Sequence, residues 1–157
     1  MPNFCESKIL PHNAEEIFAI VMDIENYPQF LPWCKQAKIV EHISANNLTA
    51  DLLISFKNIF EKYRSDVKYG AINDEAANGY FVDVYAISGP FKKLINKWQF
   101  KNLAPNKCQI DFAIDFEFNS KLLNLMIGGI FESATKKMMS AFEQRAKTLT
   151  QQPSNVC

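Results

Sequence analysis

The chain has 157 residues, a length typical of one domain, and 48% of them are hydrophobic, enough for a sizeable buried core. Lysine plus arginine and aspartate plus glutamate both number 17, so the net charge is about zero. A protein held mainly by phosphate contacts needs a clustered excess of cations, so this balance argues against DNA as a partner and leaves room only for a local basic patch.

Four cysteines are scattered along the chain without a Cys-x-x-Cys motif, and there are only two histidines. A zinc site is therefore not expected, and we place both His12 and His42 at the surface. No signal peptide is apparent, and no apolar run reaches the roughly 18 residues that span a bilayer. These features predict a cytoplasmic protein in a reducing setting, with peripheral contact to the inner membrane as an alternative.

The first elements are a short strand and an amphipathic helix. The strand covers Phe4 to Leu10, and Pro11 ends it. The sequence "HNAEEIFAIVMDIENY", residues 12–27, predicts the helix, with Asn13 as its N-cap and Glu16 at the capping-box position.

An uncharged stretch, "NYPQFLPWC" at residues 26–34, follows this helix. Pro28 and Pro32 prevent a long helix here, so we expect a short helical turn and then an apolar loop. Four large side chains of this stretch need an apolar partner elsewhere in the fold: Tyr27, Phe30, Leu31 and Trp33.

From Lys35 to Phe118 the pattern is that of β-structure, and five breakers divide it into six strands. Connections this short require antiparallel neighbours, so the strands are expected to form a meander. The breakers are "SANN", "KN", "AANG", "SGP" and "APNK", at residues 44–47, 57–58, 76–79, 88–90 and 104–107.

The last of these strands alternates apolar and polar residues from Cys108 to Asn119, so one face of the sheet is covered and the other is wet. Pairing it with the preceding strand through the turn at Pro105 places Trp98 near Phe112 and Phe100 near Ile110.

The same register places lysines on the wet face, with Lys97 and Lys101 near Asp111 and Asp115. Two interpretations remain open for this basic run: a solvated, partly ion-paired sheet face, or a binding patch. The run comprises Lys92, Lys93, Lys97 and Lys101.

Residues 120–150 predict one long helix of about 40 Å, capped by Asn119 or Ser120. Gly128 and Gly129 lie inside it and weaken it, either because helix and sheet pack closely there or because the first turns swing away to open a cavity. We expect a single domain over residues 1–150 and a disordered tail over residues 151–157.

This order of elements predicts an α+β fold, in which a seven-stranded curled antiparallel sheet wraps around the long C-terminal helix. One helix does not fill the concave face of such a sheet. The apolar loop after the first helix would then plug or line the mouth of the remaining gap.

Three motifs point to a known family: "YPQFLPWC", "SGPFKKLINKWQF" and "DFEFNSKLLNLMIGGIFESATKKMMSAFEQRA". In this order they resemble the coenzyme Q-binding START-domain proteins, which belong to the polyketide cyclase and lipid-transport group of the START-like superfamily. The resemblance implies a helix-grip fold, a hydrophobic cavity, a prenylated quinone such as ubiquinone as ligand, and a role in respiration or ubiquinone synthesis. A bacterial branch consists of toxins that block association of ribosomal subunits.

Candidate ligand-binding residues follow from the predicted gap, with plain core packing as the alternative for each. They form five groups. These are residues at the entrance, a turn that could gate the cavity, inward positions of the sheet, tyrosines whose hydroxyls could bond a quinone carbonyl, and helix positions that include adaptable methionines. In that order they are Tyr27, Phe30, Leu31 and Trp33; Pro90 and Phe91; Trp98, Phe112 and Phe116; Tyr63 and Tyr85; and Met126, Ile127, Phe131 and Met138.

No catalytic constellation is visible: the chain has no Ser/His/Asp order, no Gly-x-Ser-x-Gly and no phosphate-binding glycine loop. Asp51 and Asp66 would act as acids only if they pointed inward. We therefore expect a non-enzymatic quinone carrier without a further cofactor, with a ribosome-binding toxin and a polyketide cyclase-like enzyme as alternatives.

Overall fold

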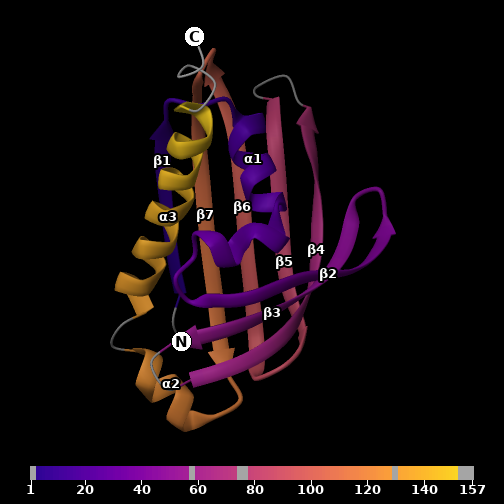
Figure 1. Cartoon of the computed structure of the whole chain (residues 1–157), viewed down its shortest axis with the longest axis vertical. Helices are drawn as coiled ribbons and strands as arrows, with labels where there is room; N and C mark the ends of the chain where they lie inside the picture. Colours follow the sequence, from indigo (N-terminus) through magenta and orange to yellow (C-terminus); the bar gives the residue numbers. More distant parts are fainter. Residues whose placement is uncertain (1–2, 57–58, 74–77, 129–130, 152–157) are drawn as a thin grey trace.

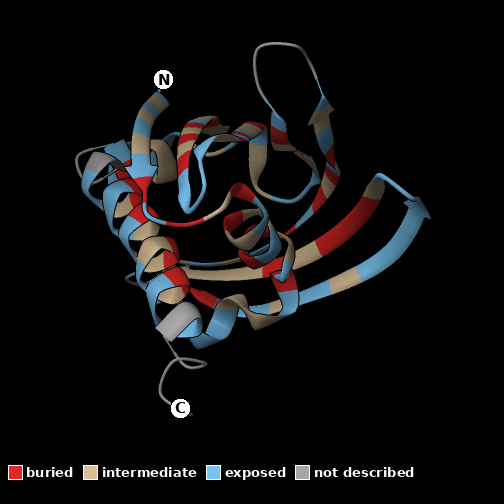
Figure 2. Ribbon diagram, turned by 90° about the horizontal axis from the view of Figure 1, so that it is seen from above, coloured by how far each residue is buried: buried red, intermediate tan, exposed pale blue. Residues whose placement is uncertain are grey.

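The computed structural model describes residues 3–56, 59–73, 78–128 and 131–151, and the side chain of Phe131 lies outside the described set. A curled sheet holds the helices on its concave side (Figures 1 and 2). The elements in chain order are β1 (Asn3–Leu10), α1 (Ala14–Met22), η1 (Ile24–Gln29), β2 (Cys34–Ser44), β3 (Asn47–Phe56), β4 (Ile59–Asn73), β5 (Asn78–Ser88), β6 (Phe91–Ala104), β7 (Lys107–Phe118), α2 (Lys121–Gly128) and α3 (Phe131–Gln151).

The seven strands form one antiparallel sheet in the order β1-β7-β6-β5-β4-β3-β2. The predicted meander from β2 to β7 is confirmed, and β1 pairs with β7 at its end. The predicted register is confirmed too, because Trp98 pairs with Phe112 and Phe100 with Ile110. These aromatic side chains form the centre of the core, where Phe100 is fully buried.

The predicted first helix is shorter than expected. The backbone N–H of Asn13 donates to the Glu16 carboxylate at 3.0 Å, so the capping box forms. However, α1 ends at Met22, where Asp23 leaves the helical conformation, and the chain continues as the 3₁₀-helix η1. Pro28 lies inside η1, a short tight turn in which a proline is tolerated.

The single long C-terminal helix is also corrected. The described residues form two helices, α2 and α3, and residues 129–130 between them lie outside the described set. A methyl group added at Gly128 would meet nothing within 4 Å, so close packing does not explain this glycine. Gly129 lies outside the described residues.

The outer face of the sheet is largely ion-paired. Lys101 contacts Asp111 at 3.3 Å, as expected, but Asp115 contacts Lys93 at 2.9 Å rather than Lys97. Lys97 lies opposite Ala113 on β7 and opposite the acidic Asp83 on β5. The interpretation of the basic run as a solvated, ion-paired face therefore accounts for most of it.

One histidine differs from the expectation. His12 is buried in the bend between β1 and α1, with its Nδ1 4.0 Å from the Glu16 carboxylate. His42 is exposed on β2, as predicted. Among the described residues, no helix is long and apolar enough to cross a membrane.

Candidate functional site: an apolar gap between the helices and the sheet

The concave side of the sheet holds two adjoining cavities. The first, of about 140 Å³, lies beside α2 and is called the α2-side cavity. The second, of about 80 Å³, lies beside η1 and is called the η1-side cavity. Trp33, Tyr63 and Met138 line both, so these three side chains separate the two spaces.

Most polar groups that border the cavities already have partners. The Trp98 indole N–H donates to Asn96 at 2.9 Å, and the Asn96 amide donates in turn to the Ala113 carbonyl at 2.9 Å. The Tyr27 hydroxyl donates to the carbonyl of Val21. These bonds hold the side chains in place and leave them unavailable to a ligand.

Tyr63 is different. Its ring is buried and lines both cavities, and its hydroxyl makes no hydrogen bond with a described residue. The hydroxyl oxygen is not fully enclosed, because the fully buried side-chain atoms without a partner among the described residues belong to Glu6 and Asp115. Burial, with a smaller contribution from the neighbouring Cys34, raises the pKa of Tyr63 above its ordinary value. The phenol therefore stays neutral and offers an O–H donor to an apolar space.

The turn before β6 fixes Tyr63 in this position. Gly89 has a φ of 125°, and a Cβ added there would lie 2.5 Å from the Tyr63 Cβ, so the turn packs directly against this residue. The Phe91 ring then contacts Tyr63 edge-on at 5.1 Å and stacks on Phe118 at 4.9 Å. The "SGPF" motif thus shapes the wall beside the free hydroxyl.

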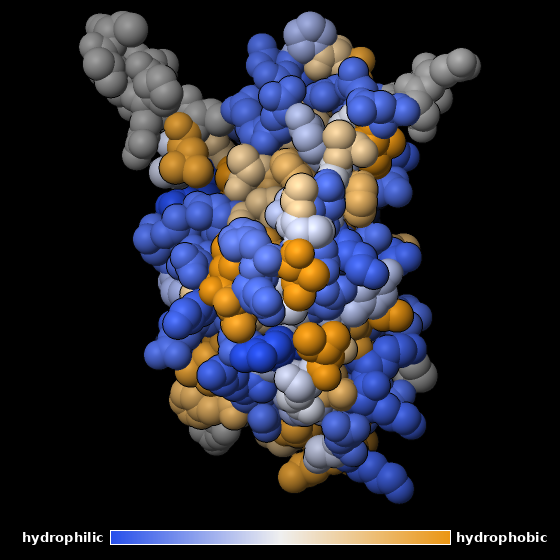
Figure 3. All heavy atoms as spheres, turned by 90° about the vertical axis from the view of Figure 1, so that its right-hand side faces the viewer, coloured by the Kyte–Doolittle hydropathy of each residue, from blue (hydrophilic) through white to orange (hydrophobic). Residues whose placement is uncertain are grey.

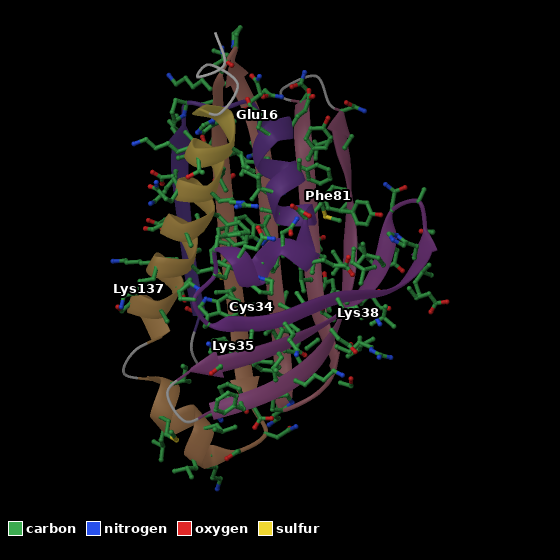
Figure 4. The ribbon with its side chains drawn as sticks, viewed as in Figure 1. Glu16, Cys34, Lys35, Lys38, Phe81 and Lys137 are labelled. Carbon is green, nitrogen blue, oxygen red and sulfur yellow. The ribbon has the colours of Figure 1, made fainter. Side chains whose placement is uncertain are left out.

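The one thiol near the gap is not set up as a nucleophile. Cys34 is buried, and its Sγ contacts the carbonyl of Gln36 at 3.5 Å. Burial raises the pKa of Cys34 to about 11, so the thiol is neutral at physiological pH. The gap is consequently lined by uncharged groups (Figure 4 labels Cys34 below η1).

Nine of the predicted residues line one or both cavities, so the apolar loop borders the gap. They come from η1 and the loop after it, from β4, from three positions in β6 and β7, and from α2 and α3. They are Tyr27, Leu31, Trp33, Tyr63, Phe91, Trp98, Phe116, Ile127 and Met138.

Other predicted residues lie close to the gap without lining it. Phe30 packs against Phe142 at 5.3 Å and joins η1 to α3. Phe112 is buried against Trp98 at 4.7 Å as plain core. Pro90 forms the turn, and its carbonyl accepts the N–H of Asn119 at 2.8 Å.

Two predicted residues point elsewhere. Val84 on β5 lines the η1-side cavity, so strand alternation places Tyr85 on the outer face of the sheet. Met126 is 41% exposed because it lies on the outward side of α2, opposite the buried Ile127. For Phe131, the described residues give no side-chain placement.

Sequence reasoning missed several lining residues. Leu94, Asn96 and Phe118 share the inward parity of Trp98 and Phe116, so alternation alone would have identified them. The others are aliphatic or small side chains indistinguishable by type from ordinary core: Val21, Ile24, Ile54, Leu52, Ser65, Val67, Val82, Val84, Ala134 and Thr135, with the aromatic Phe142.

Neither candidate carboxylate reaches the cavities. Asp51 lies on the outer face and accepts two bonds from Arg64, at 2.7 and 3.0 Å, which lower the pKa of Asp51. Asp66 accepts a bond from Asn47 at 2.7 Å on the same face. Strand alternation explains both positions, since Leu52 and Val67 beside them point inward.

A larger hollow of about 730 Å³ lies on the outer face, between β1, β7, β6 and β5. Its walls carry Asp83, Lys97 and Asp111, together with Phe81, which Figure 4 labels on β5. Charged walls suit an apolar ligand poorly, because such a ligand would leave them without water or a partner. The gap inside the curled sheet is therefore the better candidate site.

Comparison with known proteins agrees with this geometry. Residues 10–143 match the family described as polyketide cyclase/dehydrase and lipid transport. The chain is 44% identical over 150 residues to the ribosome association toxin RatA of Rickettsia prowazekii, covering 94% of this chain and 97% of that protein. It is 30% identical over 146 residues to the mitochondrial coenzyme Q-binding protein COQ10 homolog B of Xenopus laevis, covering 91% of this chain and 57% of that protein.

Among solved structures, a START superfamily protein from Mycobacterium smegmatis superposes with a TM-score of 0.77 at 20% identity, covering 94% of this chain and 98% of that one. At this identity the likeness shows the fold alone. The chain therefore belongs to the polyketide cyclase/dehydrase and lipid transport family, with the START-like helix-grip fold, and is related both to coenzyme Q-binding proteins and to ribosome association toxins.

Proposed function

We propose that the chain binds a prenylated quinone such as ubiquinone in the gap and carries it, without covalent chemistry, in support of respiration or ubiquinone synthesis. The observation that carries this proposal is the Tyr63 hydroxyl, a donor on a buried ring that makes no hydrogen bond with a described residue and borders apolar walls. A quinone offers what such a site lacks: a flat apolar ring with carbonyl acceptors.

The volume of the α2-side cavity limits which part of the ligand fits inside it. A cavity of about 150 Å³ takes a benzene-sized ring, whereas whole-ligand pockets span roughly 300–1,000 Å³. The α2-side cavity, at about 140 Å³, therefore has room for one unsubstituted six-membered ring, so the substituted quinone ring needs neighbouring side chains to shift and the prenyl tail must lie outside. The tail would leave past Ile127 and Phe118, where α2 covers the end of the cavity.

Fluorescence titration tests this proposal, because Trp33 lines both cavities and Trp98 lines the η1-side cavity. A short-tail ubiquinone should quench the emission in a saturable way. Trp33→Phe should remove more of the quench than Trp98→Phe, since only Trp33 borders the α2-side cavity. No quench at micromolar quinone, with the fold intact by circular dichroism, would reject a quinone site.

A second function has one specific observation in its favour: the 44% identity to a ribosome association toxin over nearly the full length of both chains. We propose it as the alternative in which the partner is a ribosomal subunit. Sedimentation with purified subunits tests it. Binding through lysines should weaken steeply with salt, whereas co-sedimentation that persists at about 0.2 M salt would indicate a contact not driven by phosphates.

A further inference from the structure

The short helix α2 exposes three large apolar side chains. Leu122 is 67% exposed, Leu125 79% and Met126 41%. Residues three and four positions apart lie on the same side of a helix, so the three form one apolar strip. The opposite side carries Ile127, which is buried against the sheet and lines the α2-side cavity.

The structure fixes this orientation. The Asn124 side chain accepts a bond from the Phe118 backbone N–H at 2.8 Å and donates to the Phe118 carbonyl at 3.1 Å. The Ser120 hydroxyl accepts the N–H of Leu123 at 3.3 Å and caps the helix. The strip therefore faces outward because α2 is anchored in that direction.

Two further apolar side chains lie at the same end of the sheet. Phe60, near the start of β4, is 65% exposed, and Ile87, near the end of β5, is 57% exposed. Figure 1 shows α2, the start of β4 and the end of β5 together at the lower end of the molecule. We call these five residues the apolar end: Phe60, Ile87, Leu122, Leu125 and Met126.

The surface beside the β2–β3 hairpin differs. In Figure 3, hydrophilic side chains dominate the upper and middle parts of that face, and hydrophobic ones appear between them in small groups. Isolated exposed apolar side chains are ordinary on protein surfaces, whereas an apolar strip on one helix marks an interaction surface. The apolar end therefore needs a partner.

The charge around the strip indicates the partner's chemistry. Lys121 and Lys137 are exposed, and neither has an ion pair with a described residue; Figure 4 shows Lys137 on the outer side of α3. Residues 121–137 contain three lysines and one glutamate. An apolar strip flanked by lysines is the pattern of helices that lie in the headgroup region of anionic membranes.

We propose that the apolar end docks on an anionic lipid bilayer, with α2 lying in the headgroup region and its apolar strip reaching the acyl chains. This inference rests on the proposed function for its purpose, because a prenyl tail resides in a bilayer and the α2-side cavity lies directly behind Ile127. Docking there would place the cavity at the membrane surface.

Vesicle flotation tests docking in the absence of any quinone. The full chain should float with vesicles of phosphatidylcholine and phosphatidylglycerol, and less with phosphatidylcholine alone. Leu125→Glu should lower the partition coefficient by about tenfold or more. The matched control is Ile43→Glu, which changes a 55% exposed side chain on the β2–β3 hairpin and should leave flotation unchanged.

Two charge-reversal variants measure the electrostatic contribution to membrane binding. Lys121→Glu should weaken flotation, and added salt should reduce the difference from wild type. Lys107→Glu, at an exposed position on the opposite end of the sheet, should have no effect. Failure of the wild-type chain to float, or flotation of Leu125→Glu at the wild-type level, would overturn the proposal.

Two results would assign the apolar end to another partner and would also overturn the proposal. In the first, Leu125→Glu dissociates a dimer of the chain while flotation is unchanged. In the second, Leu125→Glu dissociates a complex with a ribosomal subunit while flotation is unchanged. The membrane-docking proposal and the quinone-binding proposal can be contradicted independently of each other. A chain that floats but shows no quench by short-tail quinone contradicts the proposed function, and a chain that shows the quench but does not float contradicts docking.

Discussion

The two ends of the C-terminal helical segment are held very differently. Near its C-terminal end, α3 is clamped: the Phe142 ring contacts Tyr27 at 5.4 Å, Phe30 at 5.3 Å and Trp98 at 5.1 Å. Arg145 lies 5.2 Å above the Phe30 ring. On the other side, Lys8 of β1 contacts Glu143 at 3.3 Å.

At the other end, α2 contributes only Ile127 to the buried core. Regions with few buried apolar contacts open at a lower free energy than the whole fold. The comparison teaches that many buried rings hold one end of the segment and few buried side chains hold the other. We therefore expect α2, which borders the α2-side cavity, to open at a lower free energy than α3.

The largest expected effect on stability is at Phe142, where α3 packs against Tyr27, Phe30 and Trp98. Phe142→Ala removes a buried ring that three aromatic side chains contact, and should lower the free energy of unfolding by about 3–5 kcal/mol. Leu125→Ala is the matched control on α2: its side chain is 79% exposed, so the change should be within about 0.5 kcal/mol. Urea denaturation measures both, and similar losses would refute the contrast.

The second prediction concerns the neutral interior near the clamp. Burial raises the pKa of both Cys34 and Cys108 to about 11, and it raises the pKa of Tyr27 and Tyr63 as well. An unfolded chain releases these protons near about pH 8.5 for thiols and about 10 for phenols. Stability should therefore be full below about pH 8.5 and fall as the pH rises toward 11.

Thermal melts across that pH range measure the decline. Cys34→Ala should reduce it, whereas Cys5→Ala, at an exposed thiol, should leave it as in wild type. A stability that does not change between pH 8 and 11 would mean that the interior admits water, and would contradict a dry gap.

The smallest effect concerns Gly128, the last described residue of α2. Gly128→Ala adds a methyl group where nothing lies within 4 Å, so no clash opposes the gain in helix propensity. It should raise stability by about 0.5 kcal/mol and slow quinone release, measured by stopped-flow fluorescence. A loss of stability would mean that the glycine is needed in its present conformation, and faster release would contradict opening at this end.

Much of the fold could be predicted because its patterns are local. The alternation in β7 fixes an apolar face, and that face sets the pairing of Trp98 with Phe112. The same logic placed Trp98 and Phe116 on the inner face, and both line the cavities. Strand parity, where it is clear, therefore gives both the register and much of the site.

The remaining errors arise in elements that carry apolar side chains on both faces, because the residue types there do not show which face is buried. In β5 both faces carry aromatic side chains, so type alone did not show that Tyr85 points outward while Tyr80 points inward. In "LLNLMIGGIF" apolar residues surround the helix, so the exposed side of Met126 could not be distinguished from the buried side.

The central claim, a quinone ring held by the free hydroxyl of Tyr63, is tested most directly by a matched pair of phenol deletions. Tyr63→Phe removes the inward hydroxyl, and Tyr85→Phe removes one on the outer face of the same sheet. Titration with short-tail ubiquinone should show about fivefold weaker binding for Tyr63→Phe, the loss of one hydrogen bond, and no change for Tyr85→Phe. Equal affinities of Tyr63→Phe and wild type, with both folded, would contradict the claim.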